Sequence, residues 1–179
     1  MFPDDIVALA NEVLEAAKAE GVMVATAESC TAGLVSAALT AISGSAEVME
    51  RGFVTYTNEA KHEMLGVDSH LLDDAGAVSE PVARAMAEGA LRRSNADLTV
   101  SITGIAGPTG GAPLKPIGLV HFATARKGQP TVHRQELFGD LGRERVREAS
   151  VKVALNMLYV ALKGVQPQPR PSPPGVEKP

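Results

Sequence analysis

The alternation of strand-like and helix-like segments along the first part of the chain constrains the fold more than any other feature. Short apolar runs at 22–26 (VMVAT), 52–57 (GFVTYT) and 97–103 (DLTVSIT) are typical of buried strands. Segments with a helical spacing of apolar residues separate these runs. Because strands that are joined through helices run parallel, with right-handed crossovers, we expect all three strands to be parallel.

Capping residues mark several of the predicted helix boundaries. Gly21 and Gly66 are placed to terminate the helices that precede them. Ser79 suits an N-cap, and Pro81 is tolerated in the first turn of the helix that follows. The predicted helices cover 5–20, 32–42, 58–65, 79–93 and a long segment that ends at Gly164.

The last two strand-like runs predict a β-hairpin. They cover 119–125 (LVHFATA) and 132–138 (VHRQELF) and are joined by the turn-forming sequence RKGQP. The loop before them, 104–118, lacks a helical pattern, so the fourth strand should run antiparallel to the third. We therefore predict a three-layer α/β/α domain with a five-stranded mixed sheet in the order 2-1-3-4-5. This domain should cover 1–165, followed by a Pro-rich disordered tail over 166–179.

Composition narrows the class of protein. The chain is 45% hydrophobic, which is enough for a core, and its formal net charge of -4 without a long Lys/Arg run disfavours nucleic acid as a partner. A single cysteine excludes an internal disulfide and fits a reducing compartment. The N-terminal MFPDDIVALA lacks the pattern of a signal peptide, and no apolar stretch is long enough to span a bilayer. We expect a cytoplasmic protein with no membrane partner.

The predicted strand order also predicts where a ligand binds. In open α/β sheets, ligands lie at the carboxyl ends of the strands, beside the point where the strand order reverses. Here that point lies between the first and third strands, and the segments AESCTAG, YTNEAK and TGIAGPTGG leave the carboxyl ends of the three parallel strands. Ser29, Lys61 and Thr103 should therefore lie close together at one edge of the sheet.

Ser29 has two interpretations. Its hydroxyl could cap the following helix, or it could act as a nucleophile beside free backbone N–H groups that receive an oxyanion. Thr31 could provide the cap instead and leave Ser29 free.

Lys61 falls in the first turn of its helix, where the helix dipole disfavours a cation. A surface lysine would be only a mild misfit at this position. A buried lysine would have its ammonium form destabilised, which would lower its pKa toward neutrality and suit a general base. A serine paired with a lysine is an established combination of nucleophile and base.

The remaining polar residues near this edge suggest supporting roles. Cys30 has no evident histidine partner and is interpreted as an inert thiol, and Glu28 is interpreted as an orienting hydrogen-bond partner. The loop TGIAGPTGG could hold a phosphate through its backbone amides, or it could be a flexible connection. The carboxylates show no metal-binding spacing, so we predict neither a metal nor a cofactor.

Several long motifs resemble one known family. TAESCTAG, ERGFVTYTNEAKHEMLGV, GAVSEPVARAMAEGAL, SITGIAGPTGG and KPIGLVHFA follow one another in the order found in the CinA C-terminal domain family. The resemblance covers about Ile6 to Leu162. Stand-alone members of that family are nicotinamide-nucleotide amidases, so the resemblance implies hydrolysis of nicotinamide mononucleotide to nicotinate mononucleotide and ammonia, a step in pyridine-nucleotide recycling.

The resemblance also implies roles for individual residues. Ser29 matches the nucleophile of the family, Lys61 matches its base, and Arg143 matches an arginine that we assign to the substrate phosphate. Tyr56 and Thr103 match residues of the same pocket. From their positions after the strands, we also expect substrate binding by Glu28, Cys30, Thr31 and Gly104. Ala32 departs from the pattern, because many relatives have glycine there, and this difference should be tolerated.

A second function of a different class stays open at this stage. The domain could be a non-catalytic nucleotide-binding module of a competence- or damage-inducible protein, which would need the pocket but no deprotonated lysine. In both cases the expected partner is a small-molecule nucleotide, and we expect the chain to form a homo-oligomer, namely a dimer.

Overall fold

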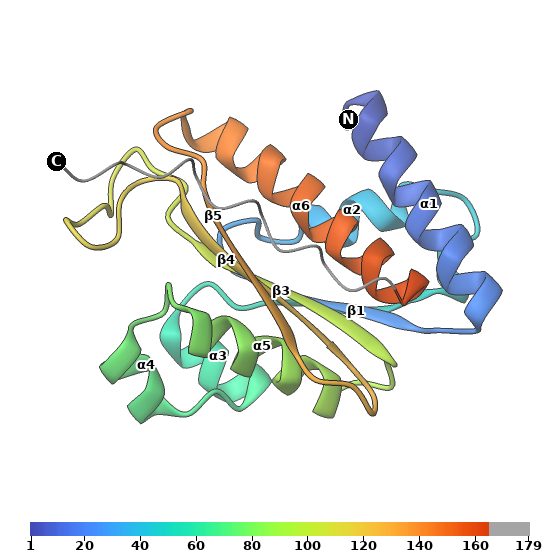
Figure 1. Ribbon diagram of the computed structural model, residues 1–179, viewed down its shortest axis with the longest axis horizontal. Helices are drawn as coiled ribbons and strands as arrows, with labels where there is room; N and C mark the ends of the chain where they lie inside the picture. The colour runs from blue at the N-terminus through green and yellow to red at the C-terminus, as the bar shows by residue number, and fades with distance from the viewer. Residues whose placement is uncertain (165–179) are drawn as a thin grey trace, which may run out of the picture.

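A five-stranded mixed sheet forms the centre of the computed structural model, which describes residues 1–164 (Figure 1). Its strands are β1 (Val24–Glu28), β2 (Met49–Val54), β3 (Leu98–Gly104), β4 (Leu119–Arg126) and β5 (Val132–Leu137). The order is β2-β1-β3-β4-β5; β1 is parallel to β2 and β3, whereas β4 is antiparallel to β3 and β5. The predicted α/β fold, the strand order and the antiparallel fourth strand are confirmed.

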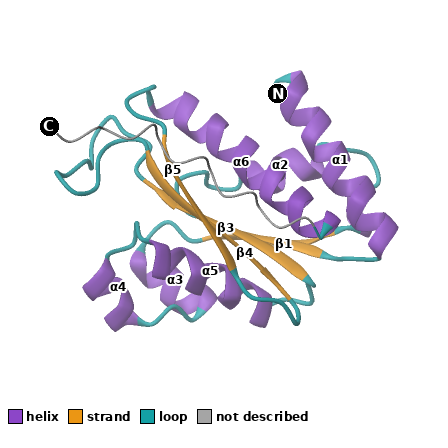
Figure 2. Cartoon of the chain, in the orientation of Figure 1, coloured by secondary structure: helices purple, strands orange, loops and turns teal. Residues whose placement is uncertain are grey.

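Helices cover both faces of this sheet (Figures 1 and 2). One face carries α1 (Asp4–Glu20), α2 (Leu34–Thr40) and α6 (Arg143–Lys163), and the other carries α3 (Asn58–Leu65), α4 (Ser69–Ala75) and α5 (Glu80–Arg92). The first layer packs on the sheet through a large apolar core that includes Val100 and Leu155, and the second through a smaller one that includes Leu65 and Met86. The three central strands β1, β3 and β4 are therefore buried on both faces, whereas the edge strands β2 and β5 are partly exposed.

The helix after β1 begins later than the sequence predicts. α2 starts at Leu34 and ends at Thr40 instead of covering 32–42. Ala32 and Gly33 have φ values of 50° and 92°, a left-handed backbone that cannot be part of a right-handed helix. A loop over residues 29–33 therefore separates β1 from α2.

Other boundaries also differ from the prediction. β2 begins at Met49 and ends at Val54, so its predicted last residues form the connection to α3 instead. α4 has no predicted counterpart, because a short helix in which only Leu72 is buried gives almost no periodic signal. Ser79 occupies the N-cap position of α5, but its hydroxyl donates to the carbonyl oxygen of Gly76 rather than accepting from the helix.

No helix among residues 1–164 combines the length and the apolar character needed to cross a membrane. The predicted Pro-rich tail lies outside the described residues.

Candidate active site

Ser29 and Lys61 meet at the carboxyl ends of β1 and β2. Ser29 directly follows β1, and Lys61 lies near the start of α3, which follows β2 after a short connection. The Nζ atom of Lys61 lies 3.1 Å from the Oγ atom of Ser29, a hydrogen-bonding distance. The parallel strands thus bring together two residues that are far apart in the sequence.

Lys61 is held in a buried environment that contains carbonyl oxygens rather than a counter-charge. Its side chain is 1% exposed, and Nζ also lies 3.0 Å from the carbonyl oxygen of Thr55 and 3.3 Å from that of Tyr56. Burial lowers the pKa of Lys61 below its ordinary value of 10.5. The neighbouring Cys30 opposes this shift only as a thiolate, and burial raises the pKa of its thiol to about 12, which keeps it neutral near pH 7. Lys61 therefore loses its proton at a lower pH than a lysine in water does.

The Ser29 hydroxyl does not cap the following helix. The N-cap position of α2 is Gly33, and no side chain at that position accepts a hydrogen bond from the helix. The Thr31 hydroxyl is buried without a hydrogen-bond partner in the described structure, so Thr31 does not provide the cap either. The interpretations of Ser29 or Thr31 as a cap are therefore wrong, because the loop holds both residues away from the helix start. Ser29 is 8% exposed, so it is less deeply buried than Lys61.

Glu28 instead accepts hydrogen bonds from the backbone N–H groups at the start of α2. Its fully buried carboxylate accepts hydrogen bonds from the backbone N–H groups of Gly33 (3.0 Å), Val35 (3.1 Å) and Ser36 (2.9 Å). It also accepts from the hydroxyls of Thr26 and Ser36, each at 3.0 Å. The free N–H groups and the dipole of a helix N-terminus both favour a carboxylate there. These contacts tie the end of β1 to the start of α2 and favour a positioning role for Glu28 over contact with a ligand.

Arg143 joins the Gly/Pro-rich loop to the region of the Ser29–Lys61 contact. It is the first residue of α6, and its guanidinium donates through Nη1 to the carbonyl oxygen of Gly107 (3.1 Å) and through Nη2 to the hydroxyl of Tyr56 (3.2 Å). Both Arg143 and the Tyr56 side chain are exposed. Since a guanidinium has five N–H donors, Arg143 has further capacity to bind an anion.

Thr103 and Gly104 lie beside the Ser29 loop at the end of β3. The backbone N–H of Ser29 donates to the carbonyl oxygen of Ile102 at 2.9 Å, which fixes the loop against this strand. The buried Thr103 hydroxyl donates to the carbonyl oxygen of Ala77 at 2.8 Å. A Cβ atom at Gly104 would lie 2.9 Å from a backbone oxygen of β4, so only glycine fits there without a shift. These two residues shape the edge of the sheet next to Ser29.

Two residues contribute hydrogen bonds to this site but are not predicted from the sequence. Arg147 on α6 donates through Nε to the carbonyl oxygen of Cys30 (3.1 Å) and through Nη2 to that of Thr31 (3.3 Å). Its position one turn after Arg143, on the same helix face, was the available signal. Thr55 contributes its backbone carbonyl, for which a side-chain pattern gives no signal.

A second cluster of titratable groups lies at β4, β5 and the start of α5, and His121 is its buried member. The Nδ1 atom of His121 on β4 is 3.0 Å from the Nε2 atom of His133 on β5, and the two rings stack with centroids 5.2 Å apart. The Nδ1 atom of His133 lies 3.4 Å from the Oε2 atom of Glu80. Burial lowers the pKa of His121 to about 4 and also lowers the pKa of His133. The cluster borders a hollow of about 280 Å³ that contains neither Ser29 nor Lys61 among its lining residues.

Within residues 1–164, no group of three or more His, Cys, Asp or Glu side chains is arranged to hold a metal ion. A larger hollow of about 690 Å³ lies along the Gly/Pro-rich loop and is lined mainly by that loop, together with Leu137, Gly139 and Asp140. Neither Ser29 nor Lys61 lines this hollow.

Comparison with known proteins gives relatives of two lengths. The chain is 48% identical over 160 residues to the nicotinamide-nucleotide amidohydrolase PncC of Escherichia coli (strain K12), an alignment that covers 89% of this chain and 96% of that protein. It is 52% identical over 145 residues to a CinA-like protein of Mycolicibacterium vanbaalenii, covering 80% of this chain but only 34% of that protein. The chain therefore spans about a third of the longer relative and nearly all of the shorter one.

A solved structure and a family model agree with these relatives. The crystal structure of the competence/damage inducible protein CihA from Agrobacterium tumefaciens superposes with a TM-score of 0.89 at 51% sequence identity, covering 91% of this chain and 98% of that one. The model of the CinA C-terminal domain matches residues 6–162, close to the limits that the motifs predict. This protein belongs to the CinA C-terminal domain family.

Proposed function

We propose that this protein is a nicotinamide-nucleotide amidohydrolase that converts nicotinamide mononucleotide to nicotinate mononucleotide and ammonia, in pyridine-nucleotide recycling. The observation that carries the proposal is the 3.1 Å contact between the Ser29 hydroxyl and the buried amine of Lys61. The activity is the one for which the Escherichia coli relative is named, and the alignment covers 96% of that relative.

The hydrogen bonds around Lys61 support its role as a base. The carbonyl oxygens of Thr55 and Tyr56 can only accept hydrogen bonds. In the neutral amine they take both N–H groups, which leaves the nitrogen lone pair to accept the proton of the Ser29 hydroxyl. In the ammonium form the third N–H donates to the Ser29 Oγ instead. The same three contacts therefore serve both protonation states, so a proton can move between the two residues without rearrangement.

In the first half of the reaction, the Ser29 Oγ attacks the carbon of the carboxamide while its proton moves to Lys61 Nζ. The tetrahedral intermediate then collapses, the C–N bond breaks, and Lys61 gives this proton to the departing nitrogen. The products of this half are ammonia and an ester between Ser29 and the nicotinoyl group.

In the second half, water attacks the carbon of the ester and gives its proton to Lys61. The bond between this carbon and the Ser29 Oγ breaks, and Lys61 returns the proton to the serine. The product carboxylic acid releases its proton to solvent, nicotinate mononucleotide leaves, and both residues are back in their starting states. This course needs no metal or cofactor, because the proton carrier and the nucleophile both belong to the protein.

Two further groups would stabilise charge on the substrate. The backbone N–H groups around Cys30 and Thr31 are the proposed donors to the oxyanion. They belong to the loop before α2 rather than to a helix N-terminus, because the helix begins only at Leu34. Arg143, exposed and already bonded to the Gly107 carbonyl, is the proposed contact for the phosphate and would favour the nucleotide over free nicotinamide.

Ammonia release from nicotinamide mononucleotide by the purified protein tests the proposal. The wild type should release ammonia, and Ser29→Ala should lower turnover by about 10³-fold or more while it still binds the nucleotide. Ser43→Ala is a matched control, since Ser43 is exposed in the loop after α2. Nucleotide binding by the wild type without ammonia release would support a non-catalytic binding module instead, and near-normal release by Ser29→Ala would exclude Ser29 as the nucleophile.

A further inference from the structure

Arg147 reaches from α6 to the loop that carries the nucleophile, although no catalytic step uses it. Its Nε donates to the carbonyl oxygen of Cys30 and its Nη2 to that of Thr31, at 3.1 Å and 3.3 Å. We propose that Arg147 is a positioning residue that orients the peptide groups after Ser29 so that the Thr31 N–H faces the developing oxyanion. This inference rests on the proposed amidohydrolase function and assigns one residue of its machinery.

The planarity of the peptide bond links these contacts to the oxyanion. In a trans peptide the C=O and the following N–H point in opposite directions. By holding the Cys30 carbonyl toward α6, Arg147 directs the N–H of Thr31 away from α6. Within residues 1–164 this N–H donates to no backbone carbonyl, whereas the N–H of Ala32 is already used by the carbonyl oxygen of Ser29 at 3.1 Å. The Thr31 N–H is therefore the backbone donor that Arg147 orients toward the oxyanion.

The middle of the loop needs such a contact, because the Thr31 side chain does not orient the peptide groups there through a hydrogen bond. The Thr31 hydroxyl has no hydrogen-bond partner among the described residues. Ala32 has a φ of 50°, a left-handed conformation that is unfavourable for any residue with a Cβ atom. Glu28 fixes the end of the loop through the N–H groups of Gly33 and Val35. Arg147 fixes the middle of the loop. An acidic side chain thus holds the loop by accepting from its N–H groups, and a basic side chain holds it by donating to its carbonyl oxygens.

The main alternative is that Arg147 binds the substrate phosphate directly. Arg143, one turn earlier, is exposed, whereas Arg147 is partly buried and two of its nitrogens already donate to the loop. The two roles differ in kinetics. A phosphate contact is made in both the ground state and the transition state, so its loss raises KM, whereas a group that positions an oxyanion donor acts mainly on kcat.

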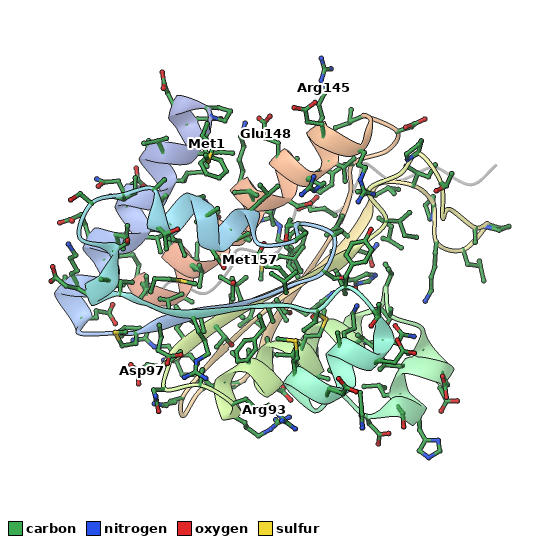
Figure 3. The ribbon with its side chains drawn as sticks, turned by 180° about the vertical axis from the view of Figure 1, so that it is seen from behind. Met1, Arg93, Asp97, Arg145, Glu148 and Met157 are labelled. Carbon is green, nitrogen blue, oxygen red and sulfur yellow. The ribbon has the colours of Figure 1, made fainter. Side chains whose placement is uncertain are left out.

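Steady-state ammonia release from nicotinamide mononucleotide by Arg147→Ala and Arg147→Lys separates these roles. We expect Arg147→Ala to lower kcat by about 10²-fold, the scale of losing one oxyanion donor, with KM nearly unchanged. The kcat/KM pH profile should keep the midpoint of the wild type, because Lys61 is untouched. Added guanidinium ion should restore part of the rate of Arg147→Ala, and Arg147→Lys should recover less than arginine because an ammonium lacks the fork of two donors. Arg145→Ala is the matched control, since Arg145 projects from α6 into solvent (Figure 3) and should behave as the wild type.

Each other outcome overturns the proposal. A raised KM with kcat preserved in Arg147→Ala would make Arg147 a phosphate contact, and unchanged kinetics would leave it no role in the reaction. If Arg147→Ala does not fold by circular dichroism, Arg147→Lys and Arg147→Gln decide, and kcat equal to the wild type in both variants would overturn the positioning role. A wild type that releases no ammonia would overturn the proposed function, and this role with it.

Discussion

Two regions of this molecule bury basic side chains, and burial changes their chemistry in different ways. At the Ser29–Lys61 contact, burial lowers the pKa of the lysine from an ordinary value of 10.5. The pKa therefore moves closer to pH 7. At the His121–His133 pair, the same effect lowers the pKa of His121 from 6.5 to about 4. This pKa therefore moves further from pH 7, and the imidazole is uncharged there. Burial thus makes a lysine more useful as a base near pH 7 and keeps a histidine neutral.

The two regions also differ in their partners. His133 has the carboxylate of Glu80 at 3.4 Å, a negative charge that partly opposes the effect of burial. Lys61 has carbonyl oxygens and a hydroxyl, and no acidic side chain forms an ion pair with it in the described structure. This difference supports our proposal that the buried amine without a counter-charge acts in catalysis, and we interpret the stacked histidines as structural.

The largest expected effect comes from changing the base itself. Lys61→Arg keeps the positive charge but removes the titration, because a guanidinium stays protonated in proteins. We expect kcat for ammonia release to fall by about 10²-fold or more, the scale of losing a positioned base. Nucleotide affinity, measured by calorimetry, should fall far less.

Lys127→Arg serves as a control for that experiment, because Lys127 is exposed and its ion pair with Asp97 is one that arginine can also make. A raised KM with kcat preserved in Lys61→Arg would show that Lys61 only contacts the substrate, and the contrast between the two regions would then fail.

A smaller effect should follow from the histidine pair. The folded-state pKa of His121 lies below its unfolded value, so the unfolded chain binds the extra proton and stability is lost as pH falls from 6.5 toward 4. The free energy of unfolding, from urea titrations, should decrease by up to about 1.4 kcal/mol per pH unit for one such proton. His121→Gln cannot titrate, so its slope between pH 6.5 and pH 4.5 should be shallower. Equal slopes in the two proteins would contradict a buried, neutral His121.

Removal of metal ions is expected to have no effect on ammonia release. The proposed reaction uses Ser29 and Lys61 alone for proton transfer and attack, so ammonia release should survive dialysis against a chelator such as EDTA. Activity that is lost on chelation and restored by one divalent ion would place a metal in the reaction and remove the need for a base of lowered pKa.

The sequence predicts the sheet and the Ser29–Lys61 contact for the same physical reason. Apolar strands joined through helices must be parallel, and parallel strands place the residues after their carboxyl ends at one edge. The prediction of residues 32–42 as a helix is wrong at its start, because nothing in an alanine at position 32 signals a left-handed backbone.

The rest of the site depends on contacts that local patterns do not contain. Arg147 meets the carbonyl oxygens of Cys30 and Thr31 only because α6 packs on the same face of the sheet as α2. The sequence predicts Glu28 as a hydrogen-bond partner, but the N–H groups that it binds depend on where α2 begins, at Leu34. Long-range packing therefore decides which side chains support the loop.

The most direct test of this account is the pKa of Lys61 in the folded wild-type protein. An NMR titration of lysine labelled with ¹³C at the ε carbon gives this value, with the Lys61 signal assigned by its disappearance in Lys61→Arg. We predict a midpoint clearly below 10.5, because burial without a counter-charge destabilises the ammonium form. A midpoint at or above 10.5 would mean that Lys61 stays charged where the enzyme works, and would contradict its role as the base for Ser29.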